Sequence, residues 1–255
     1  MIPIKTADEI VRMRKACAVA ARILDEMVKF TRVGISTYEL DCFGRDLMME
    51  FGAKSASFQY PGRYGLYPAY TCISLNDEVV HGIPSKDVVL KEGDIVSLDV
   101  ATYYRGYVGD NTQTVCVGSV PGEVDNFVRV TEEALLLGIG QAVDGNRVGD
   151  ISYAIETHAH KHGYGILRDF VGHGVGKNMH EEPQVPNYGR QKTGPVLKAG
   201  MTLAIEPMFT LGSEKVFIAD DGWTVKTVDG KLASHCEHTI LVTDSSPEVL
   251  TLVKK

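Results

Sequence analysis

The stretches VLKEGDIVSLD (residues 89–99) and VLKAGMTLAIE (residues 196–206) are two copies of one pattern, offset by 107 positions. Four of their eleven positions are identical, and each copy ends in a carboxylate on a run that is typical of a β-strand. A His-Gly pair lies upstream of each copy, at His81 and at His173. We interpret this repetition as an internal duplication.

The elements predicted around the two copies follow the same order in each half: two helices, a loop, then strands. Capping-box spacing and helical periodicity predict helices at Ala7–Phe30, from a cap at Ser36 to a stop at Gly52, at Val124–Val143 and at Ile151–His162. The predicted strands are Tyr70–Leu75, Ile95–Tyr104, Gly106–Val117, Met201–Phe209, Lys215–Thr227 and Ser234–Val242, with a hairpin turn at Asp229-Gly230. We therefore expect one α+β domain (residues 1–255) of two pseudo-symmetric halves, about 1–120 and 121–255, with a functional cleft between them.

Composition excludes several classes of protein. Lys and Arg number 26 against 33 Asp and Glu, and the net charge of −7 argues against direct nucleic-acid recognition. No uncharged apolar run approaches the roughly 18 to 20 residues of a membrane span, and the first residues have no apolar signal core. Five scattered cysteines without a C-x-x-C pair indicate free thiols in a reducing compartment, so we expect a soluble cytoplasmic protein.

Two aspartates lie on adjacent predicted strands. Alternation in residues 95–100 sets Asp99 on the face away from the apolar side chains. A hairpin centred between Tyr104 and Arg105 would put Asp99 directly opposite Asp110. Like charges in that position destabilise a sheet, so the pair requires a cation or a proton unless both carboxylates are solvated.

Two glutamates lie in similarly apolar stretches of sequence, Glu206 in residues 202–208 and Glu237 in residues 232–242. With the two aspartates and His173 they form a set of hard oxygen donors and one imidazole, which suits Mn, Fe, Co or Zn. Four carboxylates carry a charge that two divalent ions neutralise and one does not. The sequence therefore predicts a dinuclear site of the kind that assists hydrolysis.

A longer motif resembles the signature of a known family. FVGHGVGKNMHEEPQVPNY (residues 170–188) and VHGIP (residues 80–84) resemble the signatures of type I methionine aminopeptidases. The resemblance covers nearly the whole chain and implies the pita-bread fold of two pseudo-symmetric αβ halves. It also implies a monomer that removes the initiator methionine from nascent polypeptide N-termini when the second residue is small; whether the enzyme associates with the ribosome is left open.

The resemblance also implies roles for the candidate residues. Asp99 would chelate one metal, His173 and Glu206 the other, and Asp110 and Glu237 would bridge both.

Three further roles follow from the same resemblance. His81 would contact the scissile peptide, His180 would stabilise the oxygen of the tetrahedral intermediate, and Glu206 would also carry the proton. Without the family, a loop histidine such as His81 or His180 is more often a surface residue.

An apolar pocket for the methionine side chain is implied as well, with Tyr64, Tyr67, Cys72, Met179 and Trp223 as its members. The loop Ala56–Pro68 shares little with the family beyond its aromatic residues. A two-residue turn at Asp229-Gly230 would point Trp223 away from the face of Glu237, so Trp223 is either a pocket residue brought round by a bulge or an ordinary core residue.

Five other histidines fall outside these roles, and four of them form recognisable patterns. His235 shares a face with Glu237 in the predicted strand and is a candidate hydrogen-bond donor behind the metal ligands. The set His158, His160 and His162 looks like a metal-binding tract, but neighbours two apart on a helix diverge by about 200°. We interpret these three as favourable positive charge at a helix C-terminus.

Three alternatives share the expected fold. A proline dipeptidase or aminopeptidase P has the same five ligands but usually carries a large extra N-terminal domain, and about 80 residues precede His81 here. A type II methionine aminopeptidase would carry a helical insertion between His173 and Glu206, for which the gap has no room. Metal-free relatives that bind histones or RNA have typically lost ligands, whereas this chain keeps all five.

Overall fold

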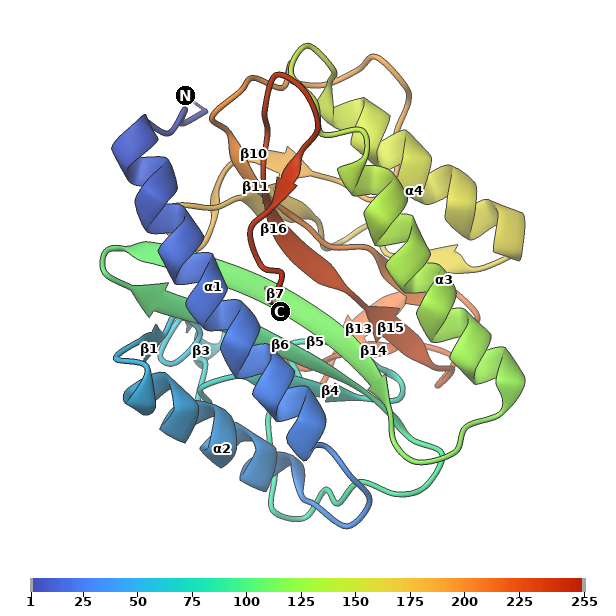
Figure 1. The fold of residues 1–255 in the computed structure, drawn as a ribbon. Coiled ribbons are helices and arrows are strands. Elements are labelled where there is room, and N and C mark those ends of the chain that lie inside the picture. Colours follow the sequence, from blue (N-terminus) through green and yellow to red (C-terminus); the bar gives the residue numbers. More distant parts are fainter. Residues whose placement is uncertain (1, 254–255) are drawn as a thin grey trace.

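A nine-stranded sheet runs through the centre of the computed structural model, which describes residues 2–253 (Figure 1). Seven strands follow the order β1-β6-β7-β16-β11-β9-β10, while β4 pairs with β6 and β17 pairs with β16. These strands are β1 (Lys54–Ser55), β4 (Cys72–Leu75), β6 (Ile95–Tyr104), β7 (Tyr107–Cys116), β9 (Gly172–Gly174), β10 (Glu181–Val185), β11 (Thr202–Ile205), β16 (Glu237–Leu241) and β17 (Glu248–Val249).

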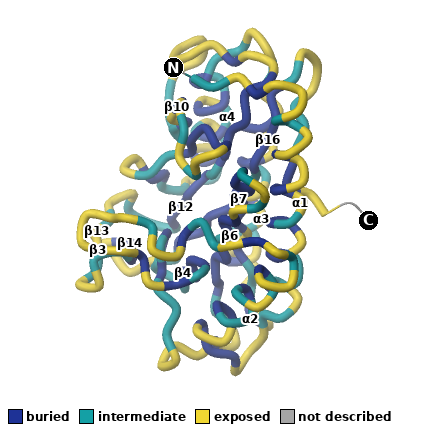
Figure 2. Tube along the Cα trace, turned by 90° about the vertical axis from the view of Figure 1, so that its left-hand side faces the viewer, coloured by how far each residue is buried: buried dark blue, intermediate teal, exposed yellow. Residues whose placement is uncertain are grey.

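Three small sheets complete the β-structure. They have the orders β15-β12-β8, β13-β14-β5 and β2-β3. Their strands are β2 (Pro61–Gly62), β3 (Gly65–Leu66), β5 (Glu78–Val80), β8 (Gly165–Ile166), β12 (Met208–Thr210), β13 (Val216–Ile218), β14 (Val225–Thr227) and β15 (Ala233–His235). The β13-β14 sheet projects on the side away from α1 (Figure 2).

Four helices cover the central sheet. They are α1 (Ala7–Phe30), α2 (Thr37–Glu50), α3 (Gly122–Ile139) and α4 (Val148–His162). The first two pack with β6 into one hydrophobic cluster, and the last two pack with β11 and β16 into another (Figure 1). None of the helices within residues 2–253 is both long and apolar enough to cross a membrane.

The duplicated frame is visible in the sheet order. The two halves meet where β7 pairs with β16, through Thr112 opposite Glu237 and Asn111 opposite His238. We call this pairing the seam. The first repeated stretch, residues 89–99, leads into β6, and the second, residues 196–206, leads into β11. Each of these strands lies one strand away from the seam, β6 next to β7 and β11 next to β16. The predicted pair of pseudo-symmetric αβ halves is confirmed.

The sequence predicts the ends of α1 and α2 more accurately than those of α3 and α4. Both capping boxes form, and α1 spans the predicted residues. Helix α3 begins after Pro121 and ends four residues before the predicted Val143, and α4 begins three residues before the predicted Ile151, where the carboxylate of Asp150 accepts from the backbone of Arg147. Neither of these helices has a Ser or Thr cap, so the sequence marks their starts weakly.

The predicted register of the β6–β7 hairpin is wrong. The turn is centred one position later, between Arg105 and Gly106, and both residues have positive φ, as the favoured two-residue hairpin turns require. Asp99 therefore pairs with Thr112, and Asp110 pairs with Ala101. The two aspartates share one face as diagonal neighbours instead of direct partners.

The predicted hairpin at Asp229-Gly230 is also wrong. Strand β14 pairs with β13 and β5, and the strand after the turn, β15, pairs with β12 in another sheet. The actual hairpin turn of this region is at 219–224, where the carboxylate of Asp221 accepts from the backbone of Trp223 and Thr224. The predicted strand 201–209 is divided at residues 206–207, and the predicted strand 234–242 is divided at Cys236.

Candidate active site

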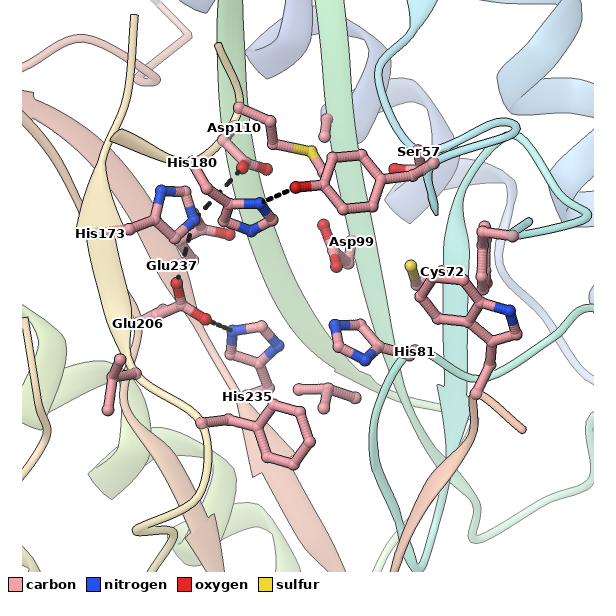
Figure 3. A pocket seen from close by; sticks show the side chains of 18 residues that line it. Ser57, Cys72, His81, Asp99, Asp110, His173, His180, Glu206, His235 and Glu237 are labelled. Carbon is pink, nitrogen blue, oxygen red and sulfur yellow. Dashed lines mark hydrogen bonds and ion pairs between the residues drawn. The ribbon is translucent and has the colours of Figure 1, made fainter. Parts of the chain in front are cut away.

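A cavity opens at the seam between the two halves (Figure 3). Its volume of about 170 Å³ is more than ten times the roughly 10 to 15 Å³ that one water requires. Eleven of the twelve candidate residues line it, namely Tyr67, Cys72, His81, Asp99, Asp110, His173, Met179, His180, Glu206, Trp223 and Glu237. The structure thus brings together side chains that are up to 170 residues apart in the sequence.

The four carboxylates come from strands on both sides of the seam. Asp99 and Asp110 lie on β6 and β7, and Glu237 is the first residue of β16. Glu206 follows β11 directly, where its backbone carbonyl accepts from the side-chain amide of Asn187 at 2.9 Å. The strands therefore aim all four groups at one point.

His173 completes this group from β9. Its Nδ1 lies 2.9 Å from the carbonyl oxygen of Gly174, an acceptor only, so Nδ1 carries the proton and Nε2 keeps its lone pair. Nε2 lies 3.5 Å from Glu206 Oε1 and 3.9 Å from Asp110 Oδ2. Ligand atoms of Asp110, His173 and Glu237 all lie within 4.8 Å of one another. A single ion could contact all three.

Burial and mutual repulsion raise the pKa values of these carboxylates. Burial raises the pKa of Asp99 to about 6 and that of Glu206 to about 8. The pKa values of Asp110 and Glu237 also lie well above the usual range, because burial is reinforced by the neighbouring carboxylates. No lysine or arginine is among the described residues that line the cavity. The cluster lacks a cation that would keep it ionised.

The donors present fit divalent metal ions. Glu237 accepts from the Thr112 hydroxyl through Oε2 at 2.9 Å, while its buried Oε1 has no hydrogen-bond partner among residues 2–253. Four carboxylates and one imidazole with a free lone pair form a donor set for Mn, Fe, Co or Zn. An ion at this point would satisfy Oε1 and offset part of the negative charge of the carboxylates.

His81 reaches the cavity through an unusual backbone conformation. Its φ is +59°, a left-handed value that non-glycine residues rarely adopt outside functional sites. The next residue must be glycine, since a Cβ on Gly82 would meet the carbonyl oxygen of Ile73 at 2.3 Å. Burial lowers the pKa of His81 to about 4, so its imidazole is neutral at pH 7.

His180 lies at the mouth of the cavity. Its Nδ1 is 2.6 Å from the hydroxyl of Tyr60, and its ring contacts the ring of His173 edge-on at 4.4 Å between centroids. Partial burial of the His180 ring lowers its pKa. Because a neighbouring side chain holds one ring nitrogen, the other is available to a ligand in the cavity.

An apolar wall faces the carboxylates. Cys72 pairs with Asp99 across β4 and β6, so both side chains point into the cavity. Tyr67 is buried and donates to the carbonyl oxygen of Gly82 at 2.8 Å. The ring of Trp223 meets that of Tyr67 edge-on, with centroids 5.1 Å apart. The hairpin that would have turned Trp223 away from this wall does not form. Strand β14, which follows it, pairs instead with β5, with a bulge between Val225 and Lys226.

Tyr64 is the exception among the candidates. Its side chain is 60% exposed and lies outside the cavity-lining residues of the described chain. It belongs to the short β2–β3 hairpin, and its Cβ packs close to Gly222. Tyr60 of the same loop, Ala56–Pro68, lines the cavity together with Tyr67, and no feature of the sequence distinguished Tyr60 from Tyr64.

Sequence reasoning also missed Ser57, Phe170 and Val171, which line the cavity. Phe170 and Val171 begin the long motif 170–188, so their position beside His173 was an available signal. His235 also lines the cavity, but from β15 and not from the strand of Glu237. Its Nε2 lies 3.5 Å from Glu206 Oε2. The group that His235 faces is therefore Glu206.

A cluster of buried carboxylates and an imidazole at the seam of a duplicated αβ frame is the architecture of a metallopeptidase. A profile of metallopeptidase family M24 matches residues 11–244, and the chain belongs to that family. It is 45% identical over 252 residues to a methionine aminopeptidase of Clostridium acetobutylicum, with 99% of each chain covered. The predicted resemblance to type I methionine aminopeptidases is thereby confirmed.

Solved structures agree with this assignment. A methionine aminopeptidase from Thermotoga maritima matches with a TM-score of 0.94 and 44% identity, over 98% of this chain and 99% of that one. A Xaa-Pro dipeptidase from Bacillus anthracis matches with a TM-score of 0.78 and 27% identity, over 99% of this chain and 62% of the other. The pita-bread fold is shared by both, and the first is the better match.

Proposed function

We propose that the protein is a methionine aminopeptidase that removes the initiator methionine from new polypeptides when the second residue is small. The observation that carries this proposal is the cavity at the seam, where a carboxylate cluster that lacks a cation faces an apolar aromatic wall. The 45% identity to a methionine aminopeptidase over nearly the full length supports the same activity. The substrates would be the N-termini of nascent proteins.

Two divalent ions would be held by residues of both halves. Asp99 would bind one ion, His173 and Glu206 the other, and Asp110 and Glu237 would be shared between them. The ions are of the Mn, Fe, Co or Zn class, and when bound they supply Lewis acidity and activate water for peptide hydrolysis. The charge of the four carboxylates favours two ions over one.

The protein's own side chains would orient the peptide and move the proton. His81, neutral and aimed into the cavity, would hydrogen-bond the scissile peptide. His180 would donate to the carbonyl oxygen as negative charge develops on it, with its ring fixed by Tyr60. Glu206, with a pKa raised to about 8 in the metal-free chain, would carry the proton to the leaving amine.

Specificity for methionine would come from the wall opposite the metal ligands. Cys72, Tyr67 and Trp223 offer a flexible thioether an apolar surface with ring edges, to which sulfur binds favourably. A charged side chain would be buried there without a partner.

The same proposal covers location and partners. The enzyme would act in the cytoplasm as a monomer on chains that are still being made, and it would require no nucleic-acid contact of its own. Docking on the ribosome would raise its local concentration near new N-termini.

A panel of peptides tests the activity. We expect rapid cleavage of Met-Ala and Met-Gly peptides, weak cleavage after leucine or norleucine, and little cleavage when the second residue is large. Chelation should abolish all of it, and Mn, Fe or Co ions should restore it. Full activity in exhaustively metal-free protein would overturn the hydrolase mechanism.

The alternative is a peptidase that cleaves ahead of proline, supported by the shared fold of the Xaa-Pro dipeptidase. Apolar pockets separate similar side chains by only about 1 to 3 kcal/mol, so the panel must compare second residues as well as first. Faster cleavage ahead of proline than of Met-Ala would favour that alternative.

A further inference from the structure

A second cluster of metal-binding side chains lies between α3 and α4, away from the seam. It consists of Glu133 on α3 and of His158 and His162 on α4. From the sequence alone, the histidine tract of α4 indicates only positive charge at a helix end. None of the three residues lines the cavity of the candidate active site.

Spacing on α4 puts two imidazoles on one face. His158 and His162 are four residues apart, hence about one helical turn, and their ring centroids are 4.8 Å apart. Two histidines at this spacing are a recurrent way for a helix to bind zinc. His160, between them, points to another side of the helix.

The neighbouring helix supplies a carboxylate at the same point. Glu133 Oε2 lies 3.2 Å from His158 Nε2, and one ligand atom from each of the three residues lies within 4.8 Å of the others. These side chains are neither fully buried nor fully exposed, and that of His158 is only 12% exposed. An ion could reach the cluster from solvent without opening the fold.

Surrounding contacts hold the ligands in place. Arg129 pairs with the other oxygen of Glu133, so Oε2 stays directed at the histidines. The ring of Tyr164 stacks on His162, and its hydroxyl accepts from the amide of Asn126 at 3.1 Å. Packing of α3 against α4 fixes the distance between the carboxylate and the imidazoles (Figure 1).

We propose that Glu133, His158 and His162 bind one Zn²⁺ ion that links α3 to α4 on the outside of the second half. Two imidazoles and one carboxylate are a common zinc ligand set, and water completes the tetrahedron. Binding replaces the contact between His158 and Glu133 with coordination of both by the ion. The ion stabilises the packing of the two helices and takes no part in peptide hydrolysis.

The test measures zinc uptake by the whole protein, loaded with Mn²⁺, in equilibrium dialysis against ZnCl₂. The variants are His162→Asn and Glu133→Gln, and the matched control is His160→Asn on the same helix. The amount of zinc that enters the active site should be the same in all of these proteins, so it cancels when their zinc contents are compared. Wild type and the control should each bind about one more zinc per chain than the ligand variants, whose affinity for this ion falls by at least about tenfold.

Thermal unfolding provides a second readout. Zinc should raise the Tm of the wild type and of His160→Asn, and it should raise the Tm of His162→Asn and Glu133→Gln less. Peptidase activity before zinc is added should be equal in all four proteins, which checks that each is folded. Equal zinc content and equal Tm shifts in all four proteins would overturn the proposal, as would loss of zinc in His160→Asn alone.

Discussion

The two halves of the molecule build the same frame but connect it differently. In the first half, β6 and β7 are joined by a two-residue turn, so Asp99 and Asp110 lie on one tight hairpin. In the second half, the equivalent strands β11 and β16 are separated by residues 206–236, which form β12 to β15. The long connection carries Trp223 to the cavity.

This difference separates metal binding from recognition of the substrate side chain. The repeated strands supply carboxylates from both sides of the seam, whereas Trp223 of the apolar wall comes from a connection without a counterpart in the first half. Ligands can therefore be tested as a matched pair, one from each half, and the wall can be tested by itself.

The largest effect is expected where the halves meet. Asp110→Ala and Glu237→Ala each remove a shared ligand, so each should lower kcat/KM on a Met-Ala peptide by about 10³-fold or more. Bound metal, measured by mass spectrometry, should fall in both variants. Asp46→Ala, at an exposed carboxylate on α2, serves as control and should retain activity and metal. High activity in either variant would show that the residue it replaces is not a required ligand.

His180 should have the next largest effect. Its loss in His180→Ala removes a donor to the developing oxyanion, which typically lowers kcat by about 10² to 10³-fold. The metal content should not change, because His180 is not placed among the ligands. Tyr60→Phe, which removes only the hydroxyl beside Nδ1, should lower kcat less. A loss of metal in His180→Ala would make this residue a ligand instead.

Trp223 tests the part of the second half that has no counterpart. Trp223→Ala should reduce kcat/KM on Met-Ala by about 10 to 100-fold and narrow the preference for methionine over leucine, with the metal content unchanged. Phe217→Ala is the matched control, since Phe217 is an aromatic residue of the same connection that is 48% exposed. If the two variants had equal kcat/KM and equal preference for methionine over leucine, Trp223 would not be part of the methionine pocket.

The smallest effect is a pH trend in the metal-free protein. Burial raises the pKa of Glu206 to about 8, above the ordinary value, so the folded state binds more protons than the unfolded state up to that pH. Stability should therefore fall as the pH rises from about 7.5 to 8.5, a window in which the buried histidines are largely neutral in both the folded and the unfolded state. Thermal unfolding should show a falling Tm, and Glu206→Gln or added Mn²⁺ should flatten the trend. A Tm that rises across this window would contradict the assignment.

The parts of the fold that local physics determines were predictable. Helix α1 spans its predicted residues because its cap and apolar period lie in adjacent residues, and β6 alternates apolar and polar side chains from Val96 to Val100. The strand pairing predicted for residues 201–242 was wrong because β14 pairs with β5, about 145 residues earlier in the chain. Pairing over that distance is decided by tertiary packing, which a turn motif such as Asp229-Gly230 does not report.

The candidate site divides in the same way. Its charged members could be recognised because a carboxylate in an apolar strand is costly wherever the strand pairs. The aromatic members could not, because Tyr60, Tyr64 and Tyr67 lie in one loop and their surroundings in the sequence are alike. Only the folded loop shows that two of the three turn inward.

The seam also determines when during translation the centre can exist. Asp99 and Asp110 are synthesised early, but Glu237, their neighbour across β7 and β16, leaves the ribosome more than a hundred residues later. A nascent first half could form its hairpin and its helical core, yet it would hold only part of the ligand set. Peptidase activity therefore arises late in synthesis, after the second half has folded onto the first, and an incomplete chain is not an active protease.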